Sequence, residues 1–343
     1  MARQARKQVV LVTGAGGEVG NGLIERLAAR AGYDILALDL KDVGPPIGDL
    51  CQARIVGDIL DQRLLERLVS EYEIHAIFHL AALLSTRAEF TPETAHEVNV
   101  RGTLNLLKLA VEQSRWHGRP VKFLFPSSIA VYGIRDRAMK EAAGPVAEAE
   151  HLVPTTMYGC NKLYCEHLGR YYARHYRQLA VASDQPGVDF RALRFPGLIS
   201  AFTAPHGGTS DYGPEMIHAA AQGEAYACFV RETATIPFMA MPDAIDALLR
   251  LMEAPREQLS RHVYNVMAYS PSAATFARLV TAAFPTADIT FAPDEKRQAI
   301  VDTWPAALDV TSAERDWGFE AAYDLERTFD DYLVPNVRRR YGV

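Results

Sequence analysis

Three glycines stand directly behind a short apolar run near the start of the chain, and this arrangement narrows the possible folds more than any other segment. The run Val9 to Val12 is long enough for one buried strand, Gly14, Gly17 and Gly20 follow it, and apolar residues then recur at helical spacing. Glycine permits a positive φ at the turn and lets the backbone approach a pyrophosphate at the N-terminus of a helix. The order strand, glycine turn, helix predicts a dinucleotide-binding unit, and a plain tight turn is the alternative.

Asp39 indicates which dinucleotide this unit binds. It ends the second apolar run, where a carboxylate can accept both ribose hydroxyls of NAD and would repel the phosphate of NADP. We therefore expect NAD, with the reservation that Lys41 is a nearby cation that could tolerate the phosphate. Asp58 and Ile59 follow the third predicted strand and are expected at the adenine. An acidic N-cap for the helix predicted at 61–72 is an equal alternative for Asp58.

Strand-like and helix-like segments alternate through the first half of the chain. We predict strands at 8–12, 34–38, 54–56, 76–80, 122–126 and 190–195, and helices at 20–30, 61–72, 93–114 and 158–176. This order is typical of an α/β fold with a doubly wound parallel sheet, the Rossmann architecture.

After Pro196 the pattern changes to loops rich in Gly, Pro and Thr, with shorter helices at 214–222, 242–252 and 272–283. We predict an NAD-binding domain at 7–200, to which the chain returns near 236–265. A smaller C-terminal substrate-binding domain is expected from 201–235 and 266–335. It should lie over the carboxyl edge of the sheet, where ligands bind in open α/β folds.

Composition and charge exclude several classes of protein. The formal net charge is −6, with 49% hydrophobic and 23% charged residues, which is ordinary globular usage and gives no general attraction to nucleic acid. The apolar runs are strand-length, so no membrane span is expected. The basic N-terminus lacks the apolar stretch of a signal peptide, which indicates the cytoplasm. The four cysteines form no C-x-x-C pair, so we expect neither a disulfide framework nor a metal.

Two polar segments are expected at the surface. The stretch 178–187 interrupts a connection between a helix and a strand that could be short, which is typical of a surface loop. The basic cluster Arg338 to Arg340 near the C-terminus is interpreted as a solvated tail.

Tyr158 and Lys162 form a candidate pair for proton transfer. Of the fifteen tyrosines only Tyr158 has a lysine four residues later, a spacing that places both side chains on one face of a helix. A phenol with an ordinary pKa of about 10 is a poor base at neutral pH, and a nearby ammonium lowers that pKa. Ser128 follows the strand predicted at 122–126 and so places a hydroxyl at its carboxyl end. A capping or turn hydroxyl is the alternative for Ser128 and the favoured interpretation of Ser127.

With a glycine loop, a strand-end serine and a helical Tyr-x-x-x-Lys in that order, the chain resembles the extended short-chain dehydrogenase/reductase family over nearly its whole length. The segments 79–82, 99–107 and 194–197 agree with this resemblance. It implies hydride transfer with NAD, Tyr158 as acid and base, Ser128 orienting the reacting hydroxyl, and Lys162 assisting Tyr158. It also implies a homodimer through the helices at 93–114 and 158–176. The cofactor-binding residues that it implies are Gly14, Gly17, Glu18, Val19, Gly20, Asp39, Asp58, Ile59, Leu80, Ala81, Ala82, Asn99, Tyr158, Lys162 and Pro196.

The second half resembles a narrower group within that family, the short-chain type of L-threonine 3-dehydrogenases. The segments that carry this likeness are 194–200, 207–213, 236–243 and 297–305. The resemblance implies oxidation of the threonine hydroxyl to 2-amino-3-oxobutanoate. The amino acid would be bound by Ser85, Ser128, Tyr158, Gly197, Thr209 and Trp304.

Several alternatives stay open for this second half. A plain loop role is the alternative for Ser85 and Thr209, and core packing is the alternative for Trp304. The rival functions are a nucleotide-sugar epimerase or dehydratase, another 3-hydroxy acid dehydrogenase, and a cofactor-sensing protein without catalysis. The second half offers no convincing set of basic and aromatic groups for a nucleotide diphosphate, which disfavours the first of these.

Overall fold

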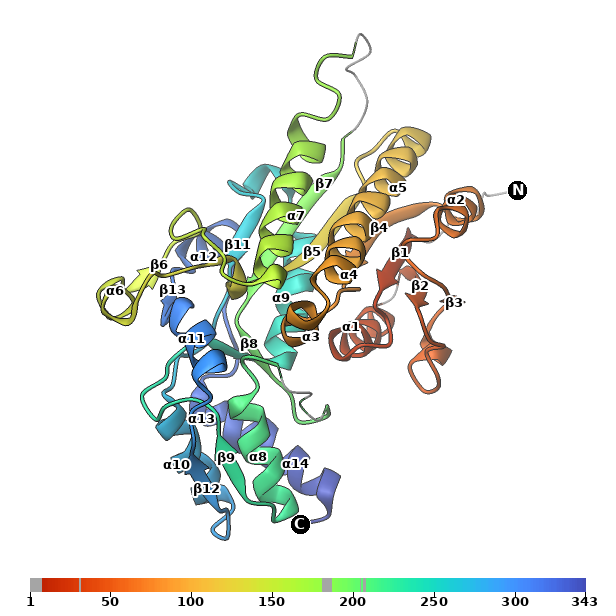
Figure 1. Ribbon diagram of the computed structural model, residues 1–343. Helices are drawn as coiled ribbons and strands as arrows, with labels where there is room; N and C mark the ends of the chain where they lie inside the picture. Colours follow the sequence, from red (N-terminus) through yellow and green to blue (C-terminus); the bar gives the residue numbers. More distant parts are fainter. Residues whose placement is uncertain (1–7, 31, 181–186, 204, 206–207) are drawn as a thin grey trace.

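A seven-stranded parallel sheet forms the centre of the protein (Figure 1). The computed structural model describes residues 8–30, 32–180, 187–203, 205 and 208–343. The strands lie in the order β11, β7, β5, β4, β1, β2, β3. Their bounds are β1 Gln8–Thr13, β2 Tyr33–Asp39, β3 Ala53–Val56, β4 Ile74–His79, β5 Lys122–Ser128, β7 Asp189–Phe195 and β11 Val263–Asn265. The predicted doubly wound α/β sheet is confirmed. The three-residue strand β11 was not predicted, because so short a run carries no usable periodicity.

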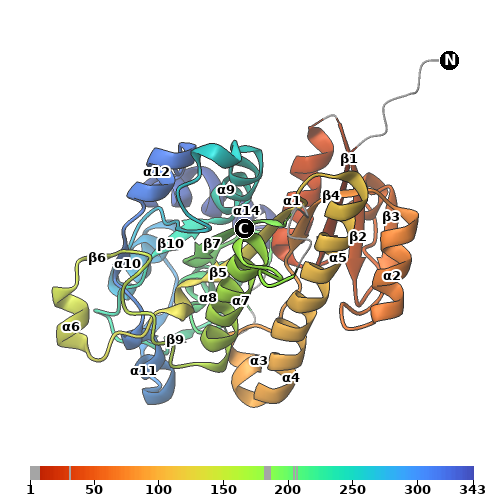
Figure 2. The same cartoon turned by 90° about the horizontal axis from the view of Figure 1, so that it is seen from above.

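Alternate residues of β1 divide between two hydrophobic layers. Val10 and Val12 pack in the layer built by α1 (Glu18–Ala29), α9 (Met241–Glu253) and α12 (Thr311–Trp317). Val9 and Leu11 pack in the layer of α2 (Gln62–Glu71), α5 (Gly102–His117) and α7 (Met157–Arg174). Successive side chains of a strand point to opposite faces, so helices on both sides bury the whole strand (Figure 2).

The helix expected at 93–114 consists of three elements. A short helix α4 (Pro92–His96) is followed by a π-helical turn η2 (Glu97–Arg101) and then by α5. A π-helical turn accommodates one extra residue and is frequent at functional sites. The helix α3 (Ser85–Phe90) was not predicted, because six residues are too few for a helical pattern to show.

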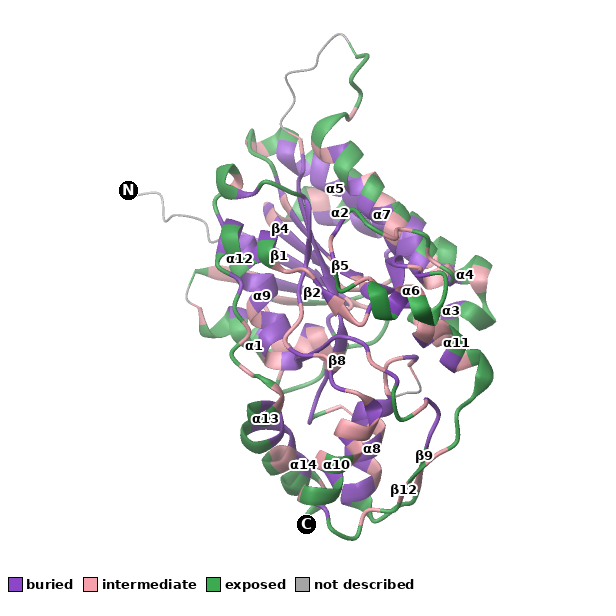
Figure 3. Ribbon diagram, turned by 90° about the vertical axis from the view of Figure 1, so that its left-hand side faces the viewer, coloured by how far each residue is buried: buried purple, intermediate pink, exposed green. Residues whose placement is uncertain are grey.

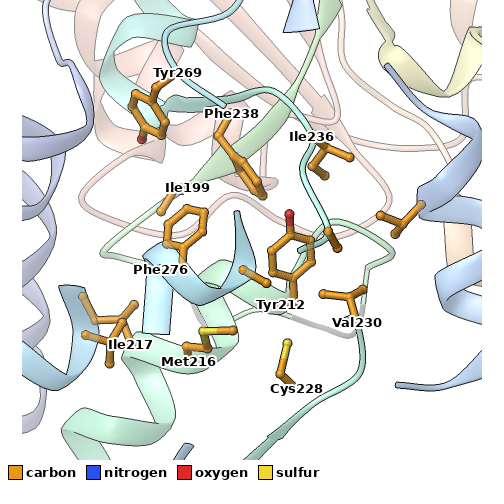
Figure 4. Close-up of a cluster of buried hydrophobic side chains, with 14 of the residues drawn as sticks. Ile199, Tyr212, Met216, Ile217, Cys228, Val230, Ile236, Phe238, Tyr269 and Phe276 are labelled. Atoms are coloured by element: carbon orange, nitrogen blue, oxygen red, sulfur yellow. The ribbon is translucent and has the colours of Figure 1, made fainter. Parts of the chain in front are cut away.

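A second hydrophobic core lies beyond β8 (Gly197–Ile199) and is built mainly by α8 (Tyr212–Gln222) and α10 (Ala273–Ala283). Three of its aromatic rings meet edge to face, with centroid distances of 5.5 Å between Tyr212 and Phe238 and 5.0 Å between Phe238 and Phe276 (Figure 4). Figure 3 shows this buried interior apart from that of the main sheet. The domain bounds proposed from the sequence stay a prediction.

The remaining elements connect these two cores. The short strand pairs are β6 (Pro145–Val146) with β13 (Ala307–Leu308), β8 with β10 (Phe238–Ala240), and β9 (Tyr226–Cys228) with β12 (Ile289–Phe291). The other helical segments are η1 Gly48–Leu50, η3 Ile129–Val131, α6 Arg137–Ala142, η4 Arg256–Gln258, α11 Glu295–Thr303, α13 Leu325–Arg327, η5 Thr328–Leu333 and α14 Val334–Tyr341.

Arg338 to Arg340 are exposed, as expected of a solvated segment, but they belong to the helix α14 and not to a tail. Arg338 Nη2 donates a hydrogen bond to the Ala283 carbonyl at 2.7 Å, and Arg340 Nη1 donates to the Phe202 carbonyl. The helix is held in place because Val337 is fully buried in the second core. Its arginines therefore fasten neighbouring main-chain segments.

The structure also bears on the loop expected at 178–187 and on the expectation of no membrane span. Residues 181–186 of the loop expected at 178–187 lie outside the described residues, and Leu179 beside them is exposed. In the part of the chain that the structure describes, no helix is long and apolar enough to cross a membrane.

Gly169 sets how closely α7 approaches the sheet. A Cβ built on Gly169 would lie 2.2 Å from Cε2 of the Phe190 ring on β7. Phe190 cannot move aside easily, because it is fully buried and its ring contacts Phe123 and Phe125 at centroid distances of 5.9 and 6.0 Å. The absent side chain therefore lets α7 lie against β7.

We expect Gly169→Ala to lower the free energy of unfolding by about 1–3 kcal/mol, because the added methyl overpacks a rigid aromatic contact. Urea denaturation measures this. In Gly169→Ala/Phe190→Leu the smaller side chain makes room, so the double variant should lose less stability than the two single variants together. Additive losses, or a Gly169→Ala protein as stable as the parent, would contradict this explanation of the glycine.

Candidate active site

The glycine turn after β1 leaves its backbone open at the carboxyl edge of the sheet. Gly14 has a φ of +69°, and a Cβ there would lie 2.6 Å from a main-chain nitrogen of the turn after β4. At Gly20 a Cβ would lie 2.6 Å from carbonyl oxygens of the glycine turn itself. Gly17 is the N-cap of α1 without a side-chain hydrogen bond, and Glu18 and Val19 form the first helical turn. These residues fit a dinucleotide, because its pyrophosphate needs backbone N–H groups at a helix N-terminus.

Asp39 lies at the end of β2, beside this turn. Its Oδ2 accepts a hydrogen bond from the Gly16 N–H at 3.0 Å, and its Oδ1 accepts one from the Lys41 N–H at 3.2 Å. Each carboxylate oxygen retains acceptor capacity for a ribose hydroxyl. The Lys41 side chain is exposed. The Asp39 carboxylate therefore lies at the end of the second strand and next to the glycine turn, as the sequence predicted.

The residues after β3 are placed at the same edge. Asp58 Oδ1 accepts from the Leu60 N–H at 2.9 Å, whereas the N-cap of α2 is Asp61. The N-cap alternative for Asp58 is therefore wrong. The Ile59 side chain is buried, and its carbonyl accepts from Asn105 Nδ2 at 3.1 Å. Their contact with an adenine remains a proposal.

The segment 80–82 after β4 is held from two sides. Its first two N–H groups donate to Thr13, at 3.0 Å to the carbonyl and 3.4 Å to Oγ1. From the π-helical turn, Asn99 pairs its amide with the backbone of Leu83, accepting at 2.8 Å and donating at 3.0 Å. Asn99 therefore acts on this segment, which borders the glycine turn.

His79 also holds the end of β4 in place, a role that the sequence did not reveal. Its ring joins Thr13 Oγ1 to Thr103 Oγ1, at 2.9 Å on each side. Burial, with a smaller effect of Lys162, lowers the pKa of His79 to about 3, so the ring is neutral. Because Thr103 already donates to the Asn99 carbonyl at 2.6 Å, we assign the ring proton to Nε2. The neutral histidine thus links β1, β4 and α5.

The structure brings Ser128, Tyr158 and Lys162 together at the end of β5. Ser128 is the N-cap of η3, where its Oγ accepts from the N–H of Ala130 at 3.1 Å, so the capping alternative for Ser128 is confirmed. Its hydroxyl also acts on Tyr158, whose pKa it lowers against the effect of burial. Lys162 Nζ lies 5.4 Å from the centroid of the Tyr158 ring and donates to the Pro126 carbonyl at 2.6 Å. Both α7 residues face the strand end, as their spacing predicts.

Burial dominates the electrostatics of this group. It raises the pKa of Tyr158 above the usual value, and the hydrogen bond with Ser128 opposes the rise. The expected lowering of this pKa by Lys162 is not seen, and the ammonium instead donates to the carbonyl of Pro126. Burial also lowers the pKa of Lys162 to about 8, against the opposing effects of Cys165 and Glu166. The phenol is thus well placed for proton transfer but needs further stabilisation of its anion.

Two elements that carry predicted substrate residues are fastened to the first turn of α7. Ser85 is the first residue of α3, and Glu89 of the same helix accepts from the Met157 N–H at 2.7 Å. Trp304 directly follows α11, whose last residue Thr303 shares a hydroxyl hydrogen bond of 3.2 Å with Thr155. Both elements therefore adjoin Tyr158.

The other predicted substrate residues lie on two loops. Pro196 and Gly197 join β7 to β8, and Thr209 is buried, with the carbonyl before it accepting from Arg297 Nη2 at 2.8 Å. Trp304 is packed in the second core, yet its Nε1 has no hydrogen-bond partner among the described residues. The core-packing alternative for Trp304 is therefore confirmed.

Beneath these groups lies a buried network that the sequence did not reveal. Ser127 Oγ donates to Glu166 Oε1 at 2.5 Å, and Arg194 donates to both Glu166 oxygens at 2.9 and 2.7 Å. Ser127 is therefore neither a cap nor a turn hydroxyl. The available signal was Glu166 itself, a carboxylate four residues after Lys162 on a helix face that is otherwise buried.

Within the described ranges, no group of three or more His, Cys, Asp or Glu side chains is arranged to bind a metal. The four cysteines are unpaired, and Cys165 and Cys228 are buried.

Comparison with known proteins agrees with this geometry. Residues 10–266 match the family described as the NAD dependent epimerase/dehydratase family. The chain belongs to this family. It is 35% identical over 322 residues to the mitochondrial L-threonine 3-dehydrogenase of Bos taurus, covering 94% of this chain and 81% of that protein.

Solved structures of family members show the same fold. The L-threonine 3-dehydrogenase of Trypanosoma brucei superposes with a TM-score of 0.84 at 32% identity, covering 97% of this chain and 98% of that one. A monomeric L-threonine 3-dehydrogenase from a metagenome gives 0.83 at 35% identity, covering 97% and 99%. Family and homologues together indicate an NAD-dependent oxidoreductase that uses a nicotinamide cofactor.

The Asp39 carboxylate should determine the choice between the two nicotinamide cofactors. We expect Asp39→Ser to lower the ratio of NAD to NADP affinity by at least about tenfold, because ribose acceptors are lost and repulsion of the phosphate is removed. Titration of each cofactor by intrinsic fluorescence measures both affinities. Lys41→Ala is the matched control: if it changes the ratio more than Asp39→Ser does, the neighbouring cation is the determinant.

Proposed function

We propose that this protein oxidises the side-chain hydroxyl of L-threonine to 2-amino-3-oxobutanoate, with NAD as the hydride acceptor. The observation that carries the proposal is the grouping of Ser128, Tyr158 and Lys162 at the end of β5, where Lys162 Nζ lies 5.4 Å from the centroid of the Tyr158 ring and Ser128 lowers the pKa of Tyr158. The likeness to L-threonine 3-dehydrogenases extends over 94% of this chain in the Bos taurus protein and 97% in the Trypanosoma brucei protein.

In the proposed reaction two bonds of the substrate break. The hydroxyl proton passes to the Tyr158 phenolate, while the hydrogen on the same carbon leaves with its electron pair and a carbonyl forms. Ser128 holds the reacting oxygen against Tyr158 by a hydrogen bond. NAD, when bound, supplies the acceptor for the hydride, and Gly14, Gly17, Gly20 and Asp39 would hold it.

The amino-acid part of the substrate would be bound by residues from separate segments. We assign hydrogen bonds to it from Ser85 and Thr209, with Gly197 and Trp304 as neighbouring walls. The unpartnered Nε1 of Trp304 supports this assignment, because a buried N–H without an acceptor is costly unless a ligand supplies one.

A nucleotide-sugar epimerase or dehydratase is the main rival function. Such an enzyme needs cations that are free to bind a diphosphate. Two arginines of the second half have internal partners instead: Arg231 pairs with Asp302 at 2.7 Å, and Arg297 donates to Gly208 and stacks on the Phe229 ring. These contacts favour the smaller amino-acid substrate.

The base that the mechanism requires should be visible in mutant kinetics. We expect Tyr158→Phe to lower kcat for L-threonine by about 10² to 10⁴, as loss of a general base typically does. Tyr164→Phe on the exposed face of α7 is the control and should retain activity. NADH formation measures both. Turnover of a UDP-hexose without NADH release would overturn the substrate assignment.

The pH dependence should report the hydrogen bond between Ser128 and Tyr158. The active base is the phenolate, so the rate rises as pH passes through the pKa of Tyr158. Because Ser128 lowers that pKa, Ser128→Ala should raise it and move the acidic limb of kcat to higher pH. A kcat profile that only decreases in height would show that Ser128 does not tune Tyr158.

We also propose a cytoplasmic homodimer in which α5 and α7 of each copy form the interface. Trp116 on α5 is 76% exposed, and Tyr164 and Tyr171 on α7 are 54% and 42% exposed. Light scattering of the purified protein should give twice the mass of the chain, and Tyr164→Asp/Tyr171→Asp should give the single mass. A parent protein that is monomeric in solution would contradict this assembly. The metagenome relative is an example of a monomeric L-threonine 3-dehydrogenase.

A further inference from the structure

Strand β7 carries two buried ion pairs of similar geometry. Near its start Arg191 pairs with Asp189 at 2.6 Å, and near its end Arg194 pairs with Glu166 of α7 at 2.7 Å. All four side chains are less than 10% exposed. Taking charges out of water is costly, so a buried pair is weak evidence for stability alone. The two pairs differ in what lies next to them.

The Glu166 carboxylate joins the helix of the site to the strand of the site. It lies on α7, one helical turn after Lys162, and accepts hydrogen bonds from Ser127 Oγ on β5 and from Arg194 on β7. Ser127 directly precedes Ser128. One carboxylate therefore connects the element that bears Tyr158 and Lys162 to the end of the strand that bears Ser128.

Arg194 is itself held by further buried groups. Its Nη1 donates to the Tyr132 hydroxyl at 2.9 Å and to the Glu148 carbonyl at 2.7 Å. The Tyr132 hydroxyl donates in turn to Asn265 Oδ1 on β11 at 2.6 Å. The network thus spans β5, α7, β7 and β11 and leaves Glu166 little freedom to move.

The charged and titratable groups that surround Lys162 come from two elements, α7 and β4. Tyr158, Cys165 and Glu166 lie on its own helix, and His79 approaches from β4. His79 is neutral, and burial raises the pKa of the Cys165 thiol to about 11, so neither carries a charge at neutral pH. Cys165 and Glu166 both oppose the lowering of the Lys162 pKa by burial, and Glu166, one helical turn after Lys162, is the carboxylate of the two.

We propose that Glu166 is a positioning residue for proton transfer: through Ser127 and Arg194 it keeps the end of β5 in register with α7, and its carboxylate lies one helical turn from Lys162, where it favours the ammonium. Where activity is the readout, this rests on the proposed function. In the dehydrogenase direction a charged Lys162 stabilises the Tyr158 phenolate, so the loss of Glu166 should weaken the base at alkaline pH.

The test uses Glu166→Gln, which preserves the shape of the side chain and removes its charge. Titration of isotope-labelled lysines by NMR, with the Lys162 signal assigned by its absence in Lys162→Met, follows the ammonium without any substrate. Removing a negative charge disfavours the ammonium, so we expect the Lys162 midpoint to fall by about one pH unit. The alkaline limb of kcat should move in the same direction.

Asp189→Asn is the matched control, because it removes the carboxylate charge of the other buried pair on the same strand. It should lower the urea midpoint of unfolding, as Glu166→Gln does, and leave the Lys162 midpoint unchanged. If both variants lose stability and neither moves the Lys162 titration, Glu166 is merely structural and the proposal is overturned.

Two further arms separate the possible failures. If Glu166→Gln does not fold, Ser127→Ala breaks the link between Glu166 and β5 while Arg194 and the carboxylate stay in place, and a kcat equal to that of the parent would overturn the positioning role. Glu166→Asp keeps the charge and should restore the midpoint. A parent protein that does not oxidise L-threonine would overturn the proposed substrate, while the lysine titration would still decide the role of Glu166.

Discussion

The candidate site depends on the close packing of α7 against the ends of β5 and β7. One face of this helix presents Tyr158, Lys162, Glu166 and Gly169 in succession. Lys162 is bound to the Pro126 carbonyl, Glu166 to Arg194, and Gly169 admits the Phe190 ring. These contacts fix the axial position and the rotation of the helix together. The distance between the phenol of Tyr158 and the hydroxyl of Ser128 follows from them.

The sequence predicted the parts of the fold that depend on local pattern. The glycine turn, Asp39 and the helical Tyr158 and Lys162 could be placed, because each is tied to a strand end or to a helical spacing. The supports of the site could not be predicted in this way. Glu166 meets Arg194, and Thr13 meets His79, across elements that are distant in the chain. Such pairings become visible only when the strand order is known.

The same burial that positions the proton-transfer group also works against its charged forms. Removing the Tyr158 phenol from water raises its pKa, and removing the Lys162 ammonium from water lowers its pKa. Both shifts disfavour the phenolate and ammonium pair that proton abstraction from an alcohol requires. The Ser128 hydroxyl opposes the first shift, and Cys165 and the Glu166 carboxylate oppose the second. A site of this kind must therefore be supported by polar groups that are themselves held by further hydrogen bonds.

The helices α3 and α11, which come from opposite halves of the chain, are both attached at the start of α7. Glu89 binds the N–H of Met157, and Thr303 binds Thr155, so α3 and α11 meet the helix at the turn that carries Tyr158. At its other end α11 holds the loop of Thr209 through Arg297. The loop of Thr209 and the start of α7 are therefore joined through α11. The residues proposed to bind the amino-acid part of a substrate are in this way built on elements that are attached next to Tyr158.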